Sequence, residues 1–219
     1  MIYDFHTHTF LSDGINSPIE LIRLASVSGY RAIAITDHAS YSNIDWLIEA
    51  AVKDCRLAEK YWDIIAIPGV ELTNIPADSI DDMAKHAKEK GAMLVVVHGE
   101  SPVEKVEPGT NLKAASSKFV DLLAHPGFLT AREAEIAIKN DVYIEITKRQ
   151  GHSLTNGIVA KTGSSAGVKF LISSDAHSHM DLYSGKMQEK VALAAGLDKK
   201  QVDNIINVNN RDFLKKIGK

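Results

Sequence analysis

Histidines and carboxylates recur in this chain at the ends of short apolar runs. The first run, residues 1–5, leads directly into His6-Thr7-His8, and another run leads into Thr36-Asp37-His38. Imidazole nitrogens and carboxylate oxygens are the ligands that zinc and related divalent ions use in proteins. One open catalytic site takes about three such ligands, so a larger set predicts two or three ions. The candidate ligands are His6, His8, Asp13, His38, Glu71, His98, His125, Asp175 and His177.

Several divalent ions held close together favour hydrolysis of a phosphate ester. Two ions about 3.5–4 Å apart that share a carboxylate can hold a bridging hydroxide and clamp both oxygens of an in-line displacement. Three such ions with the carboxylates of Asp13, Glu71 and Asp175 leave a net charge of about +3. A hydroxide and a phosphomonoester dianion would balance that charge. The balance favours a small phosphorylated substrate.

A polar segment, residues 147–153, follows the predicted strand 142–146 and leads into a predicted helix. A cation in this position can hold a phosphate group, and a helix start can bind an anion. We therefore predict Lys148, Arg149 and His152 as substrate-binding residues. Asp37, next to His38, is predicted to contact the metal ligands and orient them without binding an ion itself.

Alternating strand and helix patterns place these residues at one end of a sheet. Such alternation predicts parallel strands with right-handed crossovers. Ligands at nearly every strand end favour a closed barrel, and no glycine-rich phosphate loop follows the first strand. We predict an α/β fold, a distorted (β/α)7 TIM-like barrel, with residues 1–219 as a single domain. The predicted strands are 1–5, 32–38, 64–71, 93–98, 119–125, 142–146 and 170–175, and the predicted helices are 17–29, 44–61, 78–90, 111–116, 130–140, 154–165, 185–195 and 199–216.

Composition is that of an ordinary globular protein. Hydrophobic residues make up 45% of the 219 residues and charged residues 24%, with a net charge of -3. This charge gives no reason to expect nucleic acid or a membrane as partner. Cys55 is the only cysteine, which is typical of a reducing compartment, and we predict it to be buried and inert. The expectation is a soluble, cytoplasmic protein; its oligomeric state is not predicted.

Taken together, the motifs resemble the PHP (polymerase and histidinol phosphatase) superfamily. The resemblance runs in order from Ile2 to about His177. It implies the PHP fold, a distorted barrel of seven units that holds two or three ions, usually zinc, manganese or iron. The motifs that carry it are His6-Thr7-His8 with Asp13-Gly14, Thr36-Asp37-His38, Gly69-Val70-Glu71, His98, Ala124-His125-Pro126-Gly127 and Ser174-Asp175-Ala176-His177.

The resemblance also implies how the ligands are shared, with Glu71 as the bridge between two ions. Many family members have a histidine where Asp13 stands, and aspartate, a harder ligand, would shift the preference towards manganese or magnesium. Within the set we predict Glu71, Asp175 and His177 as catalytic. The implied sets are His6, His8, Glu71 and Asp175 for the first ion, Glu71, His98 and His125 for the second, and Asp13, His38 and His177 for the third.

The leading prediction is a metal-dependent phosphatase of the histidinol-phosphatase-like branch. A phosphodiesterase or exonuclease of the PHP type is an alternative, although the sequence has no basic, aromatic-interleaved stretch for a nucleic-acid strand. An amidohydrolase-like barrel shares the His-x-His start but commonly uses a lysine as the bridging ligand, where this chain has Glu71. A structural barrel without metals is disfavoured because every ligand position keeps a residue that can bind an ion.

Overall fold

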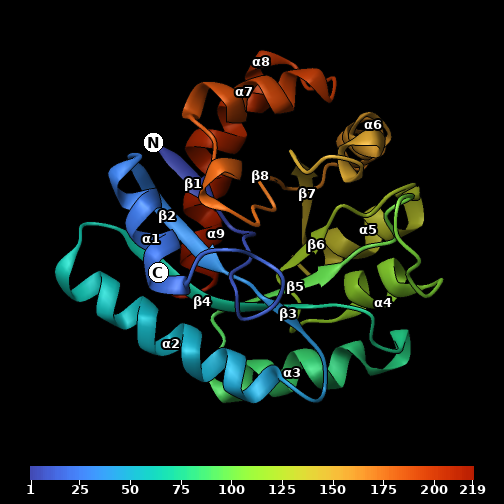
Figure 1. The fold of residues 1–219 in the computed structure, drawn as a ribbon. Helices are drawn as coiled ribbons and strands as arrows, with labels where there is room; N and C mark the ends of the chain where they lie inside the picture. The colour runs from blue at the N-terminus through green and yellow to red at the C-terminus, as the bar shows by residue number, and fades with distance from the viewer.

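The computed structural model describes residues 1–219, and its centre is a parallel sheet that curves into a nearly closed barrel (Figure 1). Seven strands follow the order β1-β2-β4-β5-β6-β7-β8, and the short β3 pairs with β4 off this path. This confirms the predicted seven-unit barrel. The strands are β1 (Ile2–Asp4), β2 (Tyr30–Ile35), β3 (His38–Ala39), β4 (Ile65–Leu72), β5 (Leu94–His98), β6 (Leu122–Ala124), β7 (Tyr143–Thr147) and β8 (Phe170–Ser173).

The seam between β1 and β8 closes only near the carboxyl ends of the two strands. Thr7 forms an isolated parallel bridge with Ala176. The backbone N–H of Ser174 donates to Oδ1 of Asp4 at 3.0 Å. Closure therefore happens beside the residues that the sequence predicts as ligands.

Helices pack around the outside of the strands, and their ends follow local sequence signals (Figure 1). Ser17 and Glu20 form a capping box at the start of α1, and Thr130 and Glu133 form one at α5. The predicted helices are confirmed within a few residues. No helix combines the length and apolarity needed to cross a membrane. The helices are α1 (Pro18–Val27), α2 (Ile44–Tyr61), α3 (Ile80–Lys90), α4 (Thr110–Ser116), α5 (Ala131–Lys139), α6 (Asn156–Ala166), α7 (Gly185–Ala194), α8 (Lys199–Asn204) and α9 (Asn210–Lys216).

The last predicted helix, 199–216, is divided in the structure. A π-helical stretch, Ile205–Asn209, separates α8 from α9. The wider π turn changes the direction in which the following side chains point. The side chain of Asn209 there donates to the carbonyl of Phe170 at 3.0 Å, which ties the stretch to β8.

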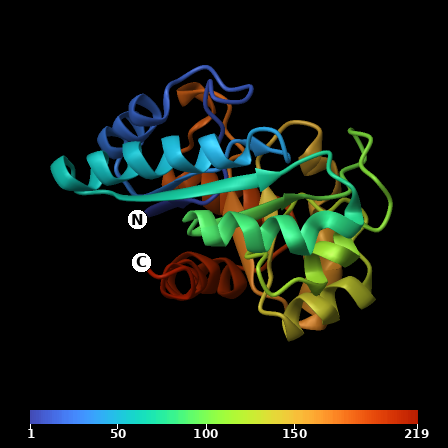
Figure 2. The same ribbon diagram turned by 90° about the horizontal axis from the view of Figure 1, so that it is seen from below.

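Helix α9 covers the amino-terminal end of the barrel (Figure 2). The ring of Phe213 meets the rings of Phe5 and Tyr143 edge-on, with centroids 4.9 and 4.8 Å apart. Lys216 on the same helix pairs with Asp121, which precedes β6. Because this end is filled by apolar side chains, the barrel opens to solvent only at the opposite, carboxyl-terminal end.

Cys55 lies on the buried face of α2 and is 1% exposed. Burial raises the pKa of its thiol, so the reactive thiolate is suppressed. The prediction of a buried cysteine is confirmed.

Candidate metal centre

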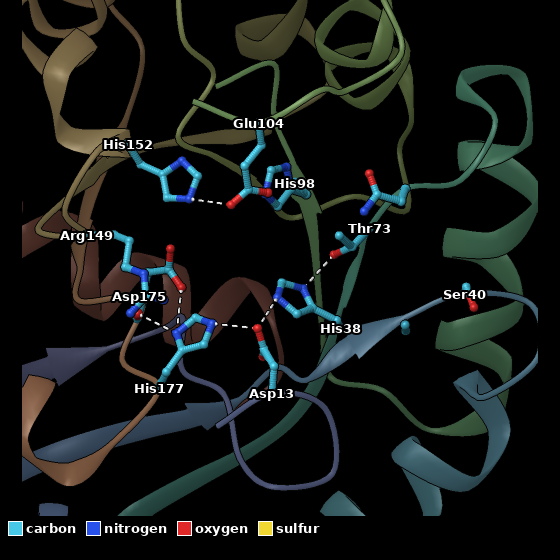
Figure 3. A pocket seen from close by; sticks show the side chains of 12 residues that line it. Asp13, His38, Ser40, Thr73, His98, Glu104, Arg149, His152, Asp175 and His177 are labelled. Atoms are coloured by element: carbon cyan, nitrogen blue, oxygen red, sulfur yellow. Dashed lines mark hydrogen bonds and ion pairs between the residues drawn. The ribbon is translucent and has the colours of Figure 1, made fainter. Parts of the chain in front are cut away.

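Polar side chains at the carboxyl ends of the strands converge on one cavity of about 350 Å³ (Figure 3). Only one lining residue is hydrophobic, so the cavity suits a polar or charged occupant. His6, His8, Glu71 and His125 lie beneath it and are fully or almost fully buried. The lining residues are Asp13, His38, Ala39, Ser40, Thr73, Asn74, His98, Glu104, Arg149, His152, Asp175 and His177.

The deepest part of the site surrounds Glu71 at the end of β4. Oε1 of Glu71 lies 3.2 Å from Nε2 of His6 and 3.5 Å from Nε2 of His125. Beside it, Nε2 of His8 lies 3.2 Å from Oδ1 of Asp175. Two groups of residues could therefore each hold an ion, and they share the imidazole of His6. One group is His6, Glu71 and His125, and the other is His6, His8 and Asp175.

The outer part of the site contains two further groups. Oδ2 of Asp13 lies 3.1 Å from Nε2 of His177 and 3.5 Å from Nε2 of His38, with His8 below them. On the other side of the cavity, ligand atoms of His98, His125 and His152 lie within 4.8 Å of one another. All the ligands predicted from the sequence thus lie together, and His152 joins them.

Buried atoms without partners fit the presence of metal ions. Oε1 of Glu71, Nδ1 of His8 and Nδ1 of His125 are buried and have no hydrogen-bond partner. A buried polar atom left unpaired is costly, and a cation would remove that cost. Imidazole and carboxylate donors suit zinc, manganese and iron. The buried clusters therefore fit a site for more than one metal.

Burial and charge hold Glu71, His8 and His152 in the form that binds a cation, whereas nearby carboxylates, acting against burial, raise the pKa of His6 and His38. Burial alone would raise the pKa of Glu71, but His6 and His38 hold it well below its usual value. Burial lowers the pKa of His8 to about 4. Burial, followed by the nearby His125, lowers the pKa of His152 to about 4 as well. Carboxylates are thus ionised and these two imidazoles neutral near pH 7, as metal ligands must be.

Two of the predicted ligands have an unusual backbone. His125 has φ of 24° and Asp175 has φ of 51°, a region that is uncommon for residues other than glycine, although aspartate, asparagine and histidine adopt it more often than the others. Such a conformation costs about 1–3 kcal/mol per residue and persists where the surroundings require it. His125 directly follows β6 and Asp175 comes two residues after the end of β8, so these sharp turns place both side chains at the cavity.

Glu145, on β7 inside the barrel, holds two ligand-bearing segments in place. Its Oε1 accepts from Nδ1 of His6 at 2.9 Å, and its Oε2 accepts from the backbone N–H of His125 at 3.0 Å. A carboxylate on the far nitrogen of a metal-binding histidine fixes the tautomer and strengthens the ligand. The sequence signal was present, since Glu145 is the only charge in the apolar run 142–146, but no role was predicted for it.

Asp37 orders the loop that carries Asp13. Its carboxylate accepts from the backbone N–H and the hydroxyl of Thr9, both at 2.8 Å, and from the hydroxyl of Ser12 at 2.7 Å. A side chain at Gly14 would collide with the backbone of His8, so only glycine fits this turn. Asp37 therefore acts on the loop that presents Asp13.

The three predicted substrate-binding residues lie in different places. Arg149 and His152 line the central cavity. Lys148 lines a neighbouring pocket instead, where its Nζ donates to the carbonyl of Asp181. Arg149 is therefore the one arginine or lysine among the residues that line the central cavity.

Known proteins with similar sequences define the family. The PHP domain model matches residues 4–216, so the chain belongs to the PHP family. An uncharacterized protein of Methanocaldococcus jannaschii is 50% identical over 218 residues, which is 99% of this chain and 100% of that protein. DNA polymerase/3'-5' exonuclease PolX of Bacillus subtilis is 27% identical over 193 residues, covering 80% of this chain and 34% of PolX.

A solved structure shares the fold at low sequence identity. YwqE from Bacillus subtilis and CpsB from Streptococcus pneumoniae are described together as metal-dependent tyrosine phosphatases. The solved structure superposes on the present one with a TM-score of 0.60 at 18% identity. The superposition covers 98% of this chain and 95% of the solved one. The likeness extends along nearly the whole barrel.

Proposed function

We propose that the 219 residues form a single PHP domain that acts as a metal-dependent phosphoesterase on a small phosphomonoester. The observation that best supports the proposal is the overlap of several buried His, Glu and Asp groups in one cavity. Each group alone could serve one ion, and their shared members would bring several ions close together. Clustered divalent ions suit the transfer of a phosphoryl group between oxygens.

Two to three divalent ions, drawn from zinc, manganese, iron and magnesium, would occupy these groups. Such ions polarise phosphoryl oxygens and generate a nucleophile from water near neutral pH. Glu71 is the best candidate for the bridge because its carboxylate lies among His6, His125 and His38 at 2.7 to 3.5 Å. Asp175 and His177 extend the set towards the cavity opening, and we infer that these three residues are catalytic.

Arg149 supplies the contact that would hold the substrate phosphate. A guanidinium can bind two oxygens of a phosphate at once, outside the reacting centre. A cavity of about 350 Å³ is at the small end of the range for ligand sites, which favours a compact substrate. With Arg149 as the cation lining it, the cavity suits one phosphate group better than a polyanionic strand.

A phosphodiesterase or exonuclease is the second candidate. The sequence similarity to PolX favours it, although this chain covers only 34% of that protein. An amidohydrolase-like reaction is supported less, because the candidate for the bridge is Glu71 and the cavity lining includes no lysine.

Matched substrates would distinguish the two phosphoesterase activities. The metal-reconstituted protein would be assayed with p-nitrophenyl phosphate and with bis-p-nitrophenyl phosphate, followed by phosphate release from histidinol phosphate, nucleotides, sugar phosphates and a short oligonucleotide. We expect a higher kcat/KM for monoesters. A clear preference for the diester and the oligonucleotide would contradict the phosphomonoester proposal and support the exonuclease alternative.

A further inference from the structure

Glu104, a residue without a sequence-based prediction, reaches the same cavity from the loop 99–109 (Figure 3). Its Oε2 lies 3.0 Å from Nε2 of His98 on β5, and its Oε1 lies 3.3 Å from Nε2 of His152. The side chain of Glu104 is 50% exposed, whereas those of His98 and His152 are only 3% and 6% exposed. One carboxylate therefore spans two buried imidazoles, one from the end of β5 and one from the segment after β7.

The orientation of His98 requires a positive charge between its ring and Glu104. Nδ1 of His98 lies 3.1 Å from the carbonyl oxygen of Gly99, which can only accept, so Nδ1 carries the proton. In a neutral ring the lone pair is then on Nε2, directed at the carboxylate. Two acceptors 3.0 Å apart repel unless a cation or a second ring proton lies between them.

At His152 the second ring nitrogen is likewise held by an outer partner. Its Nδ1 is hydrogen-bonded to the hydroxyl of Ser101, which fixes the ring so that Nε2 faces Glu104. The ring also stacks on His125, with centroids 4.2 Å apart and planes 16° apart. Histidines that bind metals typically have their second nitrogen held by such an outer partner.

Distances among these groups match those between the ligands of one ion. With bonds of about 2.0–2.1 Å to zinc, two ligands in a tetrahedral site are about 3.3 Å apart. The two contacts of Glu104 measure 3.0 and 3.3 Å. Ligand atoms of His98, His125 and His152 lie within 4.8 Å of one another, a spread that small shifts on binding would reduce.

Two other glutamates of the loop 99–109 fix its conformation through hydrogen bonds to the backbone. Oε1 of Glu100 accepts from the backbone N–H groups of Gly109 and Asn111. Oε2 of Glu107 accepts from the backbone N–H of Ala77. Because these contacts shape both ends of the loop, Glu104 at its middle is the carboxylate free to enter the cavity.

We propose that Glu104 and His152 are ligands of the ion that His98 and His125 hold. The inference rests on the proposed metal-dependent function for the presence of that ion. It gives His152 a role different from the substrate contact predicted from the sequence. It also makes the loop 99–109 part of the metal site, so that this ion would help to order the loop.

Cobalt binding tests the proposal without an activity assay. Metal-stripped wild-type protein and the variants Glu104→Gln and His152→Gln would be titrated with Co²⁺, with visible absorption and elemental analysis as readouts. We expect each variant to bind one ion at least ~10–100-fold more weakly, with the other ions unaffected and the Co²⁺ spectrum of that site changed. Ser101→Ala, which removes only the outer partner of His152, should weaken the same ion by a smaller factor.

Glu107→Gln is the matched control, because it removes one negative charge from the same loop away from the cavity, while its amide oxygen can still accept from the backbone N–H of Ala77 and keep the path of the loop. It should leave all ions at wild-type affinity. If both Glu104→Gln and His152→Gln bind every ion as the wild type does, the proposal is wrong and Glu104 serves only as an ion-pair partner. If the wild type itself binds no ion, the proposed function fails and this inference fails with it. Circular dichroism would verify the fold of each variant; Glu104→Ala replaces Glu104→Gln if that variant does not fold, and wild-type affinity in it overturns the proposal.

Discussion

The two ends of the barrel are built by the same strands but filled by opposite kinds of side chain. At the amino-terminal end, Phe5, Tyr143 and Phe213 form a close aromatic cluster under α9. At the carboxyl-terminal end, the interior is imidazole and carboxylate, with His6 and Glu71 fully buried. Burying such polar groups is costly, whereas burying aromatic rings is favourable. Stability is therefore concentrated at one end, and the groups that can do chemistry at the other.

Phe213→Ala should have the largest effect and test the stabilising end. Removing a fully buried aromatic ring costs about 3–5 kcal/mol of unfolding free energy. Urea unfolding of the metal-loaded protein would measure the loss, with Tyr61→Ala, an exposed aromatic on α2, as the control expected to change by less than about 0.5 kcal/mol. The kcat of the folded variant should stay near wild type. A large fall in kcat without a loss of stability would contradict the division between the two ends.

Glu71→Gln tests the chemical end. The change keeps the shape of the side chain and removes the charge between the two buried ion groups, so we expect kcat to fall at least ~100-fold, the upper scale of a serious metal-site lesion. Activity at saturating metal, together with elemental analysis, would measure it. The loss of stability should be smaller than for Phe213→Ala. A near-normal rate would show that Glu71 is not the bridge.

Glu145→Gln probes the boundary between the two ends. The amide can still accept from His6, but its NH₂ group would then face the backbone N–H of His125, where the wild type has an acceptor. We expect metal affinity to fall about 10–100-fold. A competition titration with a metal chelator would measure the change. Unchanged affinity would mean that Glu145 only fills space inside the barrel.

Arg149→Ala should have the smallest effect, on substrate binding alone. A cation outside the reacting centre binds the ground and transition states about equally, so KM should rise about tenfold while kcat changes less. Steady-state kinetics with a monoester would separate the two constants. Lys148→Ala is the matched control, expected to have a weak effect because Nζ of Lys148 is bonded to Asp181 outside the central cavity. Equal effects of both variants would contradict this assignment.

The predicted ligands lie together because their positions follow from periodicity. Side chains that directly follow parallel strands must meet at one rim, so residues such as His98 and His125 could be located from the sequence alone. Glu104 could not, because the path of the loop 99–109 depends on contacts such as that of Glu107 with Ala77. The π-helical stretch 205–209 likewise has no local signal, since it is tied to β8 by tertiary packing.

The seam between β1 and β8 divides the ligand set. The bond from Ser174 to Asp4 that helps to close it joins residues 170 positions apart. Bringing such distant segments together loses chain entropy before any contact compensates for it, so we expect closure to come late in folding. His6 and His8 lie on one side of the seam and Asp175 on the other. In a refolding protein, the ion that combines them would thus be taken up last and would report when the barrel has closed.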